Sequence, residues 1–159
     1  MITEGDALPD LELVDPDGGR LCLADRVGAP FVLYFYPKDD TAGCTREAQE
    51  FSASMPDFAA LDATVLGVSR DSAARHRRFT AKYELAVPLA TDDGAVSEAF
   101  GVWVEKSMYG RKYMGLDRAT FLFDATGRLA RAWRKVKVPG HVEDVLAAVR
   151  ALSTISPQH

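Results

Sequence analysis

Hydrophobic positions along the chain fall into short blocks that alternate between strand and helix character. The run Phe31–Tyr36 is continuously apolar and lies between Pro30 and Pro37, which is typical of a strand buried on both faces. Thr64–Val68 is a second buried run of the same kind. Strands of this type separated by helical segments indicate a layered α/β fold.

Helical spacing of apolar residues follows each of these runs. The first helix, beginning near Cys44, carries one apolar stripe whose members recur every three or four residues: Cys44, Ala48, Phe51 and Met55. Pro56 is expected to end this helix. Asp71 is expected to cap the next helix, which runs to about Glu84. Phe79 and Tyr83 would turn inward from it.

The remaining segments are shorter and surround this central part. They are expected to be, in order, a hairpin of Leu11–Val14 and Arg20–Leu23, a strand at Ala86–Ala90, a helix at Ala95–Phe100, a looser stretch over residues 101–117, a hairpin of Ala119–Phe123 and Leu129–Val136, and a last helix carrying apolar residues from Val142 to Leu152. This order matches a thioredoxin-like core: a central mixed sheet flanked by helices, with an N-terminal β-hairpin.

Composition supports one folded domain and excludes several other classes. The chain has 159 residues, 47% hydrophobic and 26% charged, so it is neither disordered nor fibrous. No repeat or linker-like stretch interrupts it, and residues 1–159 are expected to form a single domain with an ordered core of about residues 3–152.

Charge and hydropathy argue against nucleic acid and membrane partners. The net charge is -4, and the longest purely apolar run has six residues, far short of the roughly 18 needed to span a bilayer. Two basic stretches are interpreted as solvated surface: Arg75, Arg77, Arg78 and Lys82, and Lys106, Arg111 and Lys112. The acidic N-terminus does not look like a signal peptide, so a cytoplasmic location is expected.

Two cysteines, Cys22 and Cys44, are too few for a disulfide scaffold or a zinc ribbon. They leave three alternatives: inert buried thiols, one structural disulfide, or redox and nucleophilic chemistry. A permanent disulfide is the weakest of these, because cytoplasmic thiols are normally kept reduced. The histidines show no metal-ligand spacing, so no metal site is expected.

Cys44 follows a predicted strand and loop and lies in the first turn of a predicted helix. On position alone a buried free cysteine is favoured, because cysteine is among the most buried residue types. The alternative is a reactive thiolate, since a helix N-terminus can lower the pKa of a thiol from about 8.5 to roughly 3.5–7.5. Gly43 would allow close backbone approach to whatever meets the sulfur.

Two upstream residues complete the pattern Pro37-x-x-x-Thr41-x-x-Cys44. The proline stiffens the loop, and the Thr41 hydroxyl can both donate to and accept from a group bound at the sulfur. Thr41 could equally be a simple helix N-cap. No C-x-x-C pair is present, so disulfide exchange of the thioredoxin type lacks its second thiol.

The segment FVLYFYPKDDTAGCTREAQEF resembles the active-site segment of the peroxiredoxins, in particular the bacterioferritin comigratory protein (peroxiredoxin Q) branch. Co-linear stretches extend the resemblance over nearly the whole chain, among them GVWVEKSMYGRKYMGLDRATFLFD and VKVPGHVEDVL. The resemblance implies a thioredoxin fold and a thiol-dependent peroxidase that reduces hydrogen peroxide and organic hydroperoxides. It also implies that no metal, haem or flavin is needed, and that the protein is a monomer.

By this resemblance Cys44 is the peroxidatic cysteine, Thr41 orients the peroxide and Pro37 shields the sulfur. Arg118 matches the active-site arginine of the family, and Glu47 the position that orients this arginine. Their alternatives are a solvated charge at the start of a strand for Arg118, and a favourable acid in the first helical turn for Glu47.

The sequence departs from its relatives where a resolving cysteine is expected. Many members have it five residues after the peroxidatic one, where this chain has Gln49, and residues 72–84 contain no cysteine either. Cys22, on a predicted strand, is interpreted as a packing residue; the less favoured alternative is that it is the resolving thiol. The resemblance thus implies a one-cysteine enzyme, reduced by thioredoxin, glutaredoxin or a low-molecular-weight thiol. The alternative is a peroxide sensor or holdase-like interaction protein without efficient turnover.

Overall fold

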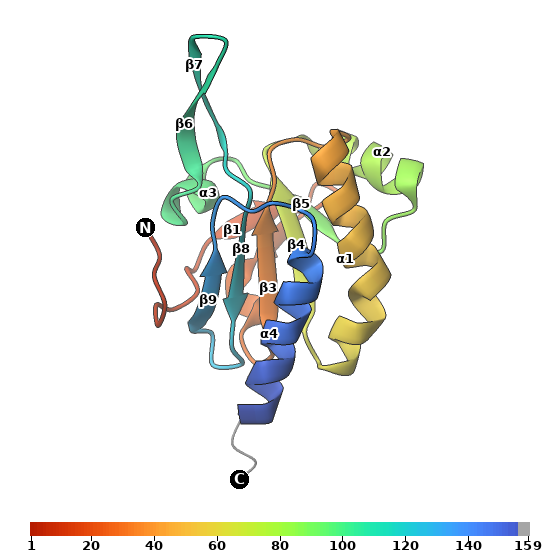
Figure 1. Cartoon of the computed structure of the whole chain (residues 1–159), viewed down its shortest axis with the longest axis vertical. Helices are drawn as coiled ribbons and strands as arrows, with labels where there is room; N and C mark the ends of the chain where they lie inside the picture. Colours follow the sequence, from red (N-terminus) through yellow and green to blue (C-terminus); the bar gives the residue numbers. More distant parts are fainter. Residues whose placement is uncertain (156–159) are drawn as a thin grey trace.

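The computed structural model describes residues 1–155, with side chains for residues 1–152, so the last residues of the predicted domain, 156–159, lie outside the described residues. Figure 1 shows the arrangement of the elements. The strands are β1 (Glu12–Val14), β2 (Arg20–Cys22), β3 (Phe31–Phe35), β4 (Thr64–Ser69), β5 (Leu89–Thr91), β6 (Trp103–Met108), β7 (Arg111–Leu116), β8 (Ala119–Phe123) and β9 (Leu129–Trp133). The helices are η1 (Leu23–Arg26), α1 (Ala42–Ala60), α2 (Ala73–Tyr83), α3 (Ala95–Ala99) and α4 (His141–Ile155).

A seven-stranded mixed sheet in the order β2-β1-β5-β4-β3-β8-β9 forms the centre of the molecule. The neighbours β3, β4 and β5 run parallel, while β8 lies antiparallel to β3 on its other side. The pairing places Phe31 opposite both Thr64 and Phe123. The predicted α/β fold with a mixed sheet and an N-terminal hairpin is therefore confirmed.

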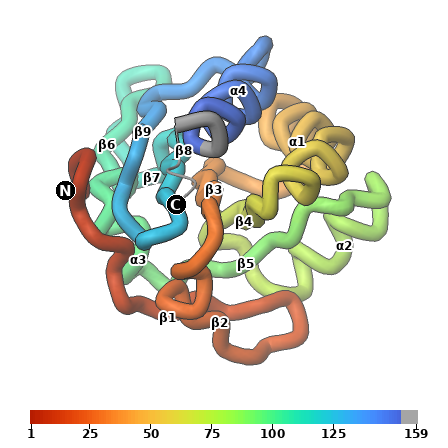
Figure 2. Tube along the Cα trace, turned by 90° about the horizontal axis from the view of Figure 1, so that it is seen from below, coloured from red at the N-terminus to blue at the C-terminus, as the bar shows by residue number. Residues whose placement is uncertain are grey.

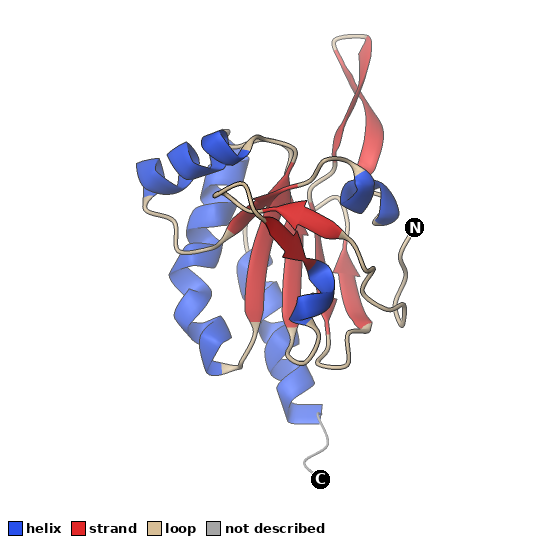
Figure 3. Ribbon diagram, turned by 180° about the vertical axis from the view of Figure 1, so that it is seen from behind, coloured by secondary structure: helices blue, strands red, loops and turns tan. Residues whose placement is uncertain are grey.

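The sheet is covered on both faces, which explains why the β3 sequence is continuously apolar. Val32 and Tyr34 point toward α1 and α4, which lie side by side on one face with α2 beside them (Figures 1 and 2). Phe31, Leu33 and Phe35 point to the opposite face, where α3 and the N-terminal segment pack. Figure 3 shows this second face from behind. All five β3 side chains are buried, so the strand cannot alternate apolar and polar residues.

Pro56 does not end the first helix, contrary to the prediction. Helix α1 continues through it to Ala60. A proline inside a helix costs about 3 kcal/mol because it removes one backbone hydrogen bond and crowds the preceding turn. The turn after Pro56 carries Phe58, which is completely buried and whose ring lies 6.1 Å from that of Phe51. Burial of this ring offsets much of the cost.

Two other predictions are corrected near the surface. Ser72, not Asp71, caps α2, because its hydroxyl accepts a hydrogen bond from the Arg75 backbone N–H at 3.2 Å. The expected loose stretch over residues 101–117 contains the β6–β7 hairpin, which projects beyond the body (Figures 1 and 3). Its turn residues Tyr109 and Gly110 both have positive φ, as a tight two-residue hairpin turn requires.

Two element boundaries differ from those expected in the second half of the sheet. The strand expected at Ala86–Ala90 is β5, which begins only at Leu89, and β9 ends at Trp133 rather than Val136. Both corrections shorten or shift elements without changing their order.

Candidate active site

The loop after β3 leads into α1 at the end of the sheet where the parallel strands β3 and β4 have their carboxyl ends. Thr41 is the N-cap residue of α1 with extended backbone angles, but its side chain does not cap the helix. The Thr41 hydroxyl instead donates to the Lys38 carbonyl at 2.9 Å, which closes the loop on itself. Cys44 follows in the first helical turn and is only 2% exposed.

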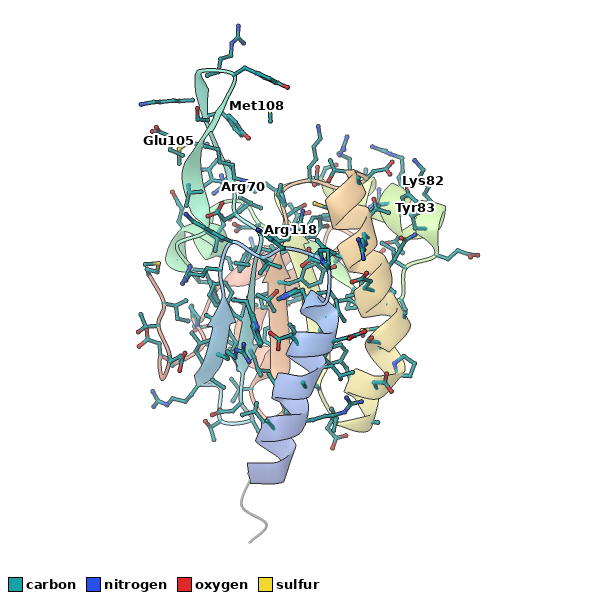
Figure 4. The ribbon with its side chains drawn as sticks, in the orientation of Figure 1. Arg70, Lys82, Tyr83, Glu105, Met108 and Arg118 are labelled. Carbon is teal, nitrogen blue, oxygen red and sulfur yellow. The ribbon has the colours of Figure 1, made fainter. Side chains whose placement is uncertain are left out.

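Arg118 connects Cys44 to Glu47. It lies directly before β8, at the same end of the sheet as the start of α1 (Figure 4). Its Nη2 donates to the Cys44 sulfur at 3.4 Å, and its Nη1 donates to Glu47 Oε1 at 2.6 Å. Gly43 permits this approach, because a Cβ atom there would lie 3.1 Å from Arg118 Nη2. The guanidinium is therefore fixed between a thiol and a carboxylate.

In this cluster, burial and the charge of the partner shift the pKa of Glu47 in opposite directions, and the same holds for Arg118. Glu47 is completely buried in the second turn of α1, so it is not the acid of the first helical turn that the alternative interpretation required. Burial raises the pKa of Glu47 to about 7 although Arg118 acts to lower it. Burial acts to lower the pKa of Arg118, but the negative charges of Glu47 and Cys44 outweigh it and raise that pKa.

The sequence did not predict a buried polar network that packs against the loop between β3 and α1, residues 36–41, called the active-site loop below. Asp39 accepts a hydrogen bond from the Tyr36 hydroxyl at 2.5 Å, and its other oxygen lies 2.7 Å from His76 Nδ1. The Asp39 backbone N–H donates to Asp71 at 2.8 Å. Thus Asp71, expected to be a helix cap, instead anchors the loop.

Next to this network, Asp40 ties the same loop to the end of α2. It receives hydrogen bonds from Lys82 at 2.8 Å and from the Tyr83 hydroxyl at 2.5 Å (Figure 4). The backbone of Asp40 has a φ of 62°, in the left-handed region that aspartate tolerates better than most residues. Two sets of contacts therefore hold the loop in place: a buried set at Asp39 and an exposed set at Asp40.

Comparison with known proteins places the chain in a family. The AhpC/TSA family model matches residues 4–132. The chain belongs to this family. Peroxiredoxin Bcp of Bacillus subtilis is 47% identical over 150 residues, which cover 94% of this chain and 96% of that protein. These matches confirm the predicted membership of the bacterioferritin comigratory protein branch, and with it the prediction of a thiol-dependent peroxidase.

Solved structures agree with this assignment. Xanthomonas campestris peroxiredoxin Q has a TM-score of 0.88 and 45% identity, covering 95% of this chain and 99% of that one. A second Xanthomonas campestris structure concerns the alkyl peroxide reduction activity of the bacterioferritin comigratory protein; it has a TM-score of 0.87 and 46% identity and covers 93% and 99% of the two chains.

The second thiol of this peroxiredoxin, Cys22, lies far from the first. It is half-buried on β2, the edge strand of the sheet, where its sulfur donates to Glu12 Oε2 at 3.4 Å. This hydrogen bond, together with partial burial and nearby acidic charges, raises the pKa of Cys22. Helix α1 covers β3 and β4, three to four strand spacings from β2, or about 14–19 Å. A disulfide requires Cα atoms within about 7 Å.

Other predicted site residues of this peroxiredoxin make no hydrogen bond to the Cys44 sulfur in the described part of the chain. Pro37 and Gln49 are exposed, and in the described part of the chain no hydrogen bond joins Thr41 to the Cys44 sulfur. Among residues 1–152, no group of three or more histidine, cysteine or acidic side chains is placed to hold a metal ion. None of the described helices is both long enough and apolar enough to cross a membrane.

Proposed function

We propose that this peroxiredoxin reduces hydrogen peroxide and organic hydroperoxides through a sulfenic acid formed on Cys44. The observation that carries the proposal is the guanidinium of Arg118, which contacts the Cys44 sulfur through Nη2 while Glu47 holds Nη1. A cation in this position stabilises a thiolate and offers a fixed fork of donors to peroxide oxygens. The alkyl peroxide reduction attributed to the Xanthomonas campestris relative supports organic hydroperoxides as substrates.

In the proposed reaction the Cys44 thiolate attacks the terminal peroxide oxygen in line with the O–O bond. The new S–O bond forms as the O–O bond breaks, and the electron pair leaves on the second oxygen, which takes a proton to become water or an alcohol. Arg118 and the N–H groups at the start of α1 stabilise the developing negative charge. Thr41 orients the peroxide and Pro37 shields the sulfur from bulk water. The thiolate supplies both electrons, so the step requires no metal, haem or flavin.

The sulfenic acid is then reduced by an external thiol. Gln49 replaces the resolving cysteine of many relatives, and the whole chain contains only Cys22 besides Cys44. The separation of about 14–19 Å between β2 and the strands under α1 argues against direct resolution by Cys22. Thioredoxin, glutaredoxin and low-molecular-weight thiols are the candidate reductants.

Peroxide consumption with dithiothreitol as reductant tests the proposed peroxidase. The wild-type protein is expected to turn over repeatedly, while Cys44→Ser loses all turnover and Cys22→Ser retains it. Equal rates for the wild type and Cys44→Ser would overturn the proposal. A single oxidation event without repeated turnover would instead favour the peroxide sensor, which also uses Cys44 oxidation.

Intact-mass analysis after one equivalent of hydrogen peroxide tests the one-cysteine mechanism. The expected product is the chain carrying one additional oxygen, about 16 Da heavier, with that oxygen on Cys44. A loss of about 2 Da, together with a peptide in which Cys22 is linked to Cys44, would contradict external resolution. Cys22→Ser is the matched control, because it removes any internal disulfide.

A further inference from the structure

A shallow cavity of about 480 Å³, open to solvent, lies where β9 runs into α4. Its lining includes Trp133, Lys135, Lys137 and His141. An open cavity of this size can receive the polar end of a small molecule without enclosing the whole molecule. The mechanism proposed above uses none of these residues.

The cavity presents uncompensated positive charge. Neither Lys135 nor Lys137 has an ion-pair or hydrogen-bond partner within the described part of the chain. The one acidic residue in the lining, Asp144, already accepts from Trp133 Nε1 at 2.8 Å and from Arg131 at 3.3 Å. Arg134 is directed elsewhere, because its guanidinium donates to the carbonyls of Phe100 and Ile2. Two lysines therefore determine the charge of the cavity.

His141 is an uncharged residue of the cavity lining near neutral pH, since burial lowers the pKa of its ring to about 4. Its Nε2 lies 2.8 Å from the Thr120 hydroxyl, and its ring meets Trp133 edge-to-face at 5.9 Å between centroids. Lys135 is held with a φ of 51°, a backbone conformation that costs a lysine about 1 kcal/mol or more. Such strain is common at functional sites.

The cavity lies beside the Cys44 cluster. Val136 is part of the cavity lining, and its backbone N–H donates to the Arg118 carbonyl at 2.9 Å. The lining is thus hydrogen-bonded directly to the backbone of Arg118. The loop between β9 and α4 crosses the end of the sheet at which Arg118 is labelled (Figures 1 and 4). A ligand of tripeptide length, about 10 Å, can reach from this loop toward the sulfur.

We propose that this cavity binds the carboxylates of an anionic low-molecular-weight thiol, which is the reductant of oxidised Cys44. This inference rests on the proposed function, because only a sulfenic acid without an internal partner needs such a thiol. Lys135 and Lys137 pair with the carboxylates, and Trp133, whose ring carries the Arg131 guanidinium over one face, lines the same cavity. The thiol end then extends past Arg118 to Cys44.

The reduction balances with two molecules of thiol. The first thiolate attacks the Cys44 sulfur, an S–S bond forms, the S–O bond breaks, and the hydroxide takes a proton and leaves as water. The second thiolate attacks the sulfur of the first, which releases Cys44 and a disulfide of the small thiol. The two electrons that reduce the sulfenic acid come from these two thiols.

The test compares glutathione with its diethyl ester, which carries the same thiol without free carboxylates. The rate constant for reduction of peroxide-treated enzyme is measured for the wild type, Lys137→Gln and Lys135→Gln/Lys137→Gln. Glutamine removes the charge while keeping an unbranched polar side chain that is one atom shorter, and it leaves the backbone strain at position 135 in place. Arg150→Gln, at an exposed arginine on α4, is the control for loss of one positive charge.

We expect the wild type to prefer glutathione over the ester, Lys137→Gln to reduce that preference roughly threefold, and the double variant to reduce it further. The preference should also fall as salt rises from about 0.02 M to about 0.5 M. Rates with dithiothreitol and rates of Cys44 oxidation by hydrogen peroxide should be the same in all variants. Equal use of acid and ester by the wild type would overturn this inference alone. Failure of every thiol, dithiothreitol included, would overturn the proposed peroxidase cycle itself.

Discussion

The two cysteines of this chain meet opposite electrostatic environments. The Cys44 sulfur accepts a hydrogen bond from the guanidinium of Arg118, whereas the Cys22 sulfur donates one to the carboxylate of Glu12. A cationic donor stabilises the thiolate, while an anionic acceptor stabilises the protonated thiol. Cys44 is buried and Cys22 is half-buried, so accessibility favours Cys22 as the reactive thiol, whereas the charge of the nearest partner favours Cys44. The charge of the nearest partner distinguishes them.

The two environments also differ in how the fold assembles them. Glu12 faces Cys22 directly across the β1–β2 hairpin, so this pair needs only local structure. Arg118 is separated from Cys44 by more than 70 residues, and they meet only when β8 pairs with β3. The cationic partner of Cys44 thus depends on long-range strand pairing within the sheet.

Removing the cationic partner of Cys44 should have the largest effect. Arg118→Ala is expected to lower the second-order rate constant for Cys44 oxidation by hydrogen peroxide about 100- to 1,000-fold, because one charged donor to the reacting atoms is lost. Stopped-flow or competition kinetics measure this constant directly. Arg118→Lys should recover only part of the rate, since an ammonium lacks the planar fork that reaches both Cys44 and Glu47.

Arg150→Ala, which removes an exposed arginine far along α4, is the control and should retain the wild-type rate constant. If Arg118→Ala oxidises as fast as the wild type, the contrast between the two cysteines does not arise from their charged partners. The helix N-terminus of α1 would then be sufficient to activate Cys44.

The next prediction concerns the carboxylate that holds Arg118. Burial raises the pKa of Glu47 from 4.5 to about 7, so the native state favours its protonated form more than the unfolded state does. The resulting stabilisation is fully present below about pH 4.5 and is lost as the pH rises through about 7. This displacement of the pKa corresponds to about 3 kcal/mol at high pH.

Glu47→Gln cannot titrate and should lack this loss. We expect the difference in unfolding free energy between Glu47→Gln and the wild type to shift in favour of the variant between about pH 4.5 and pH 8. Urea denaturation at several pH values gives this difference, in which the other ionisable groups cancel. A difference that stays constant with pH would mean that Glu47 titrates normally in the native state.

The network beneath the active-site loop provides a third, smaller effect. Asp39→Asn is expected to lower the free energy of unfolding by roughly 2 kcal/mol, because a buried carboxylate that serves both Tyr36 and His76 is lost. Asp40→Asn is the matched control at the neighbouring exposed aspartate, with an expected cost below about 1 kcal/mol. Denaturant unfolding measures both variants. Equal losses would show that burial does not distinguish the two anchors of the loop.

The sequence predicted best those elements whose pattern comes from burial. The continuous apolar run of β3 and the stripe of α1 follow directly from packing on both faces of one sheet. The β6–β7 hairpin was not predicted because most of its side chains do not pack against the core, and Tyr109 at its turn is 99% exposed. Its sequence therefore lacks the burial pattern that marks the other strands. The end of α1 was missed because burial of Phe58 overrides the local effect of Pro56.

The site was predictable only in part. Periodicity placed Cys44 at a helix N-terminus, but the pairing with Arg118 and Glu47 came from the family resemblance, since no local pattern connects such distant residues. Asp39 and His76 carried no signal, because they meet only when α2 packs against the loop after β3. The cytoplasmic location and the monomeric state stay predictions.

The smallest effect is expected at Cys22, the cysteine whose nearest partner is a carboxylate. Glu12→Gln removes the negative charge next to Cys22 but leaves a side chain able to hydrogen-bond. The pKa of Cys22 should fall toward its ordinary value, and alkylation by iodoacetamide near pH 8 should accelerate roughly threefold in a Cys44→Ser background. Asp25→Asn, which removes only a more distant charge, should change the rate less. If Glu12→Gln leaves the rate unchanged, the neighbouring carboxylate does not control the reactivity of Cys22.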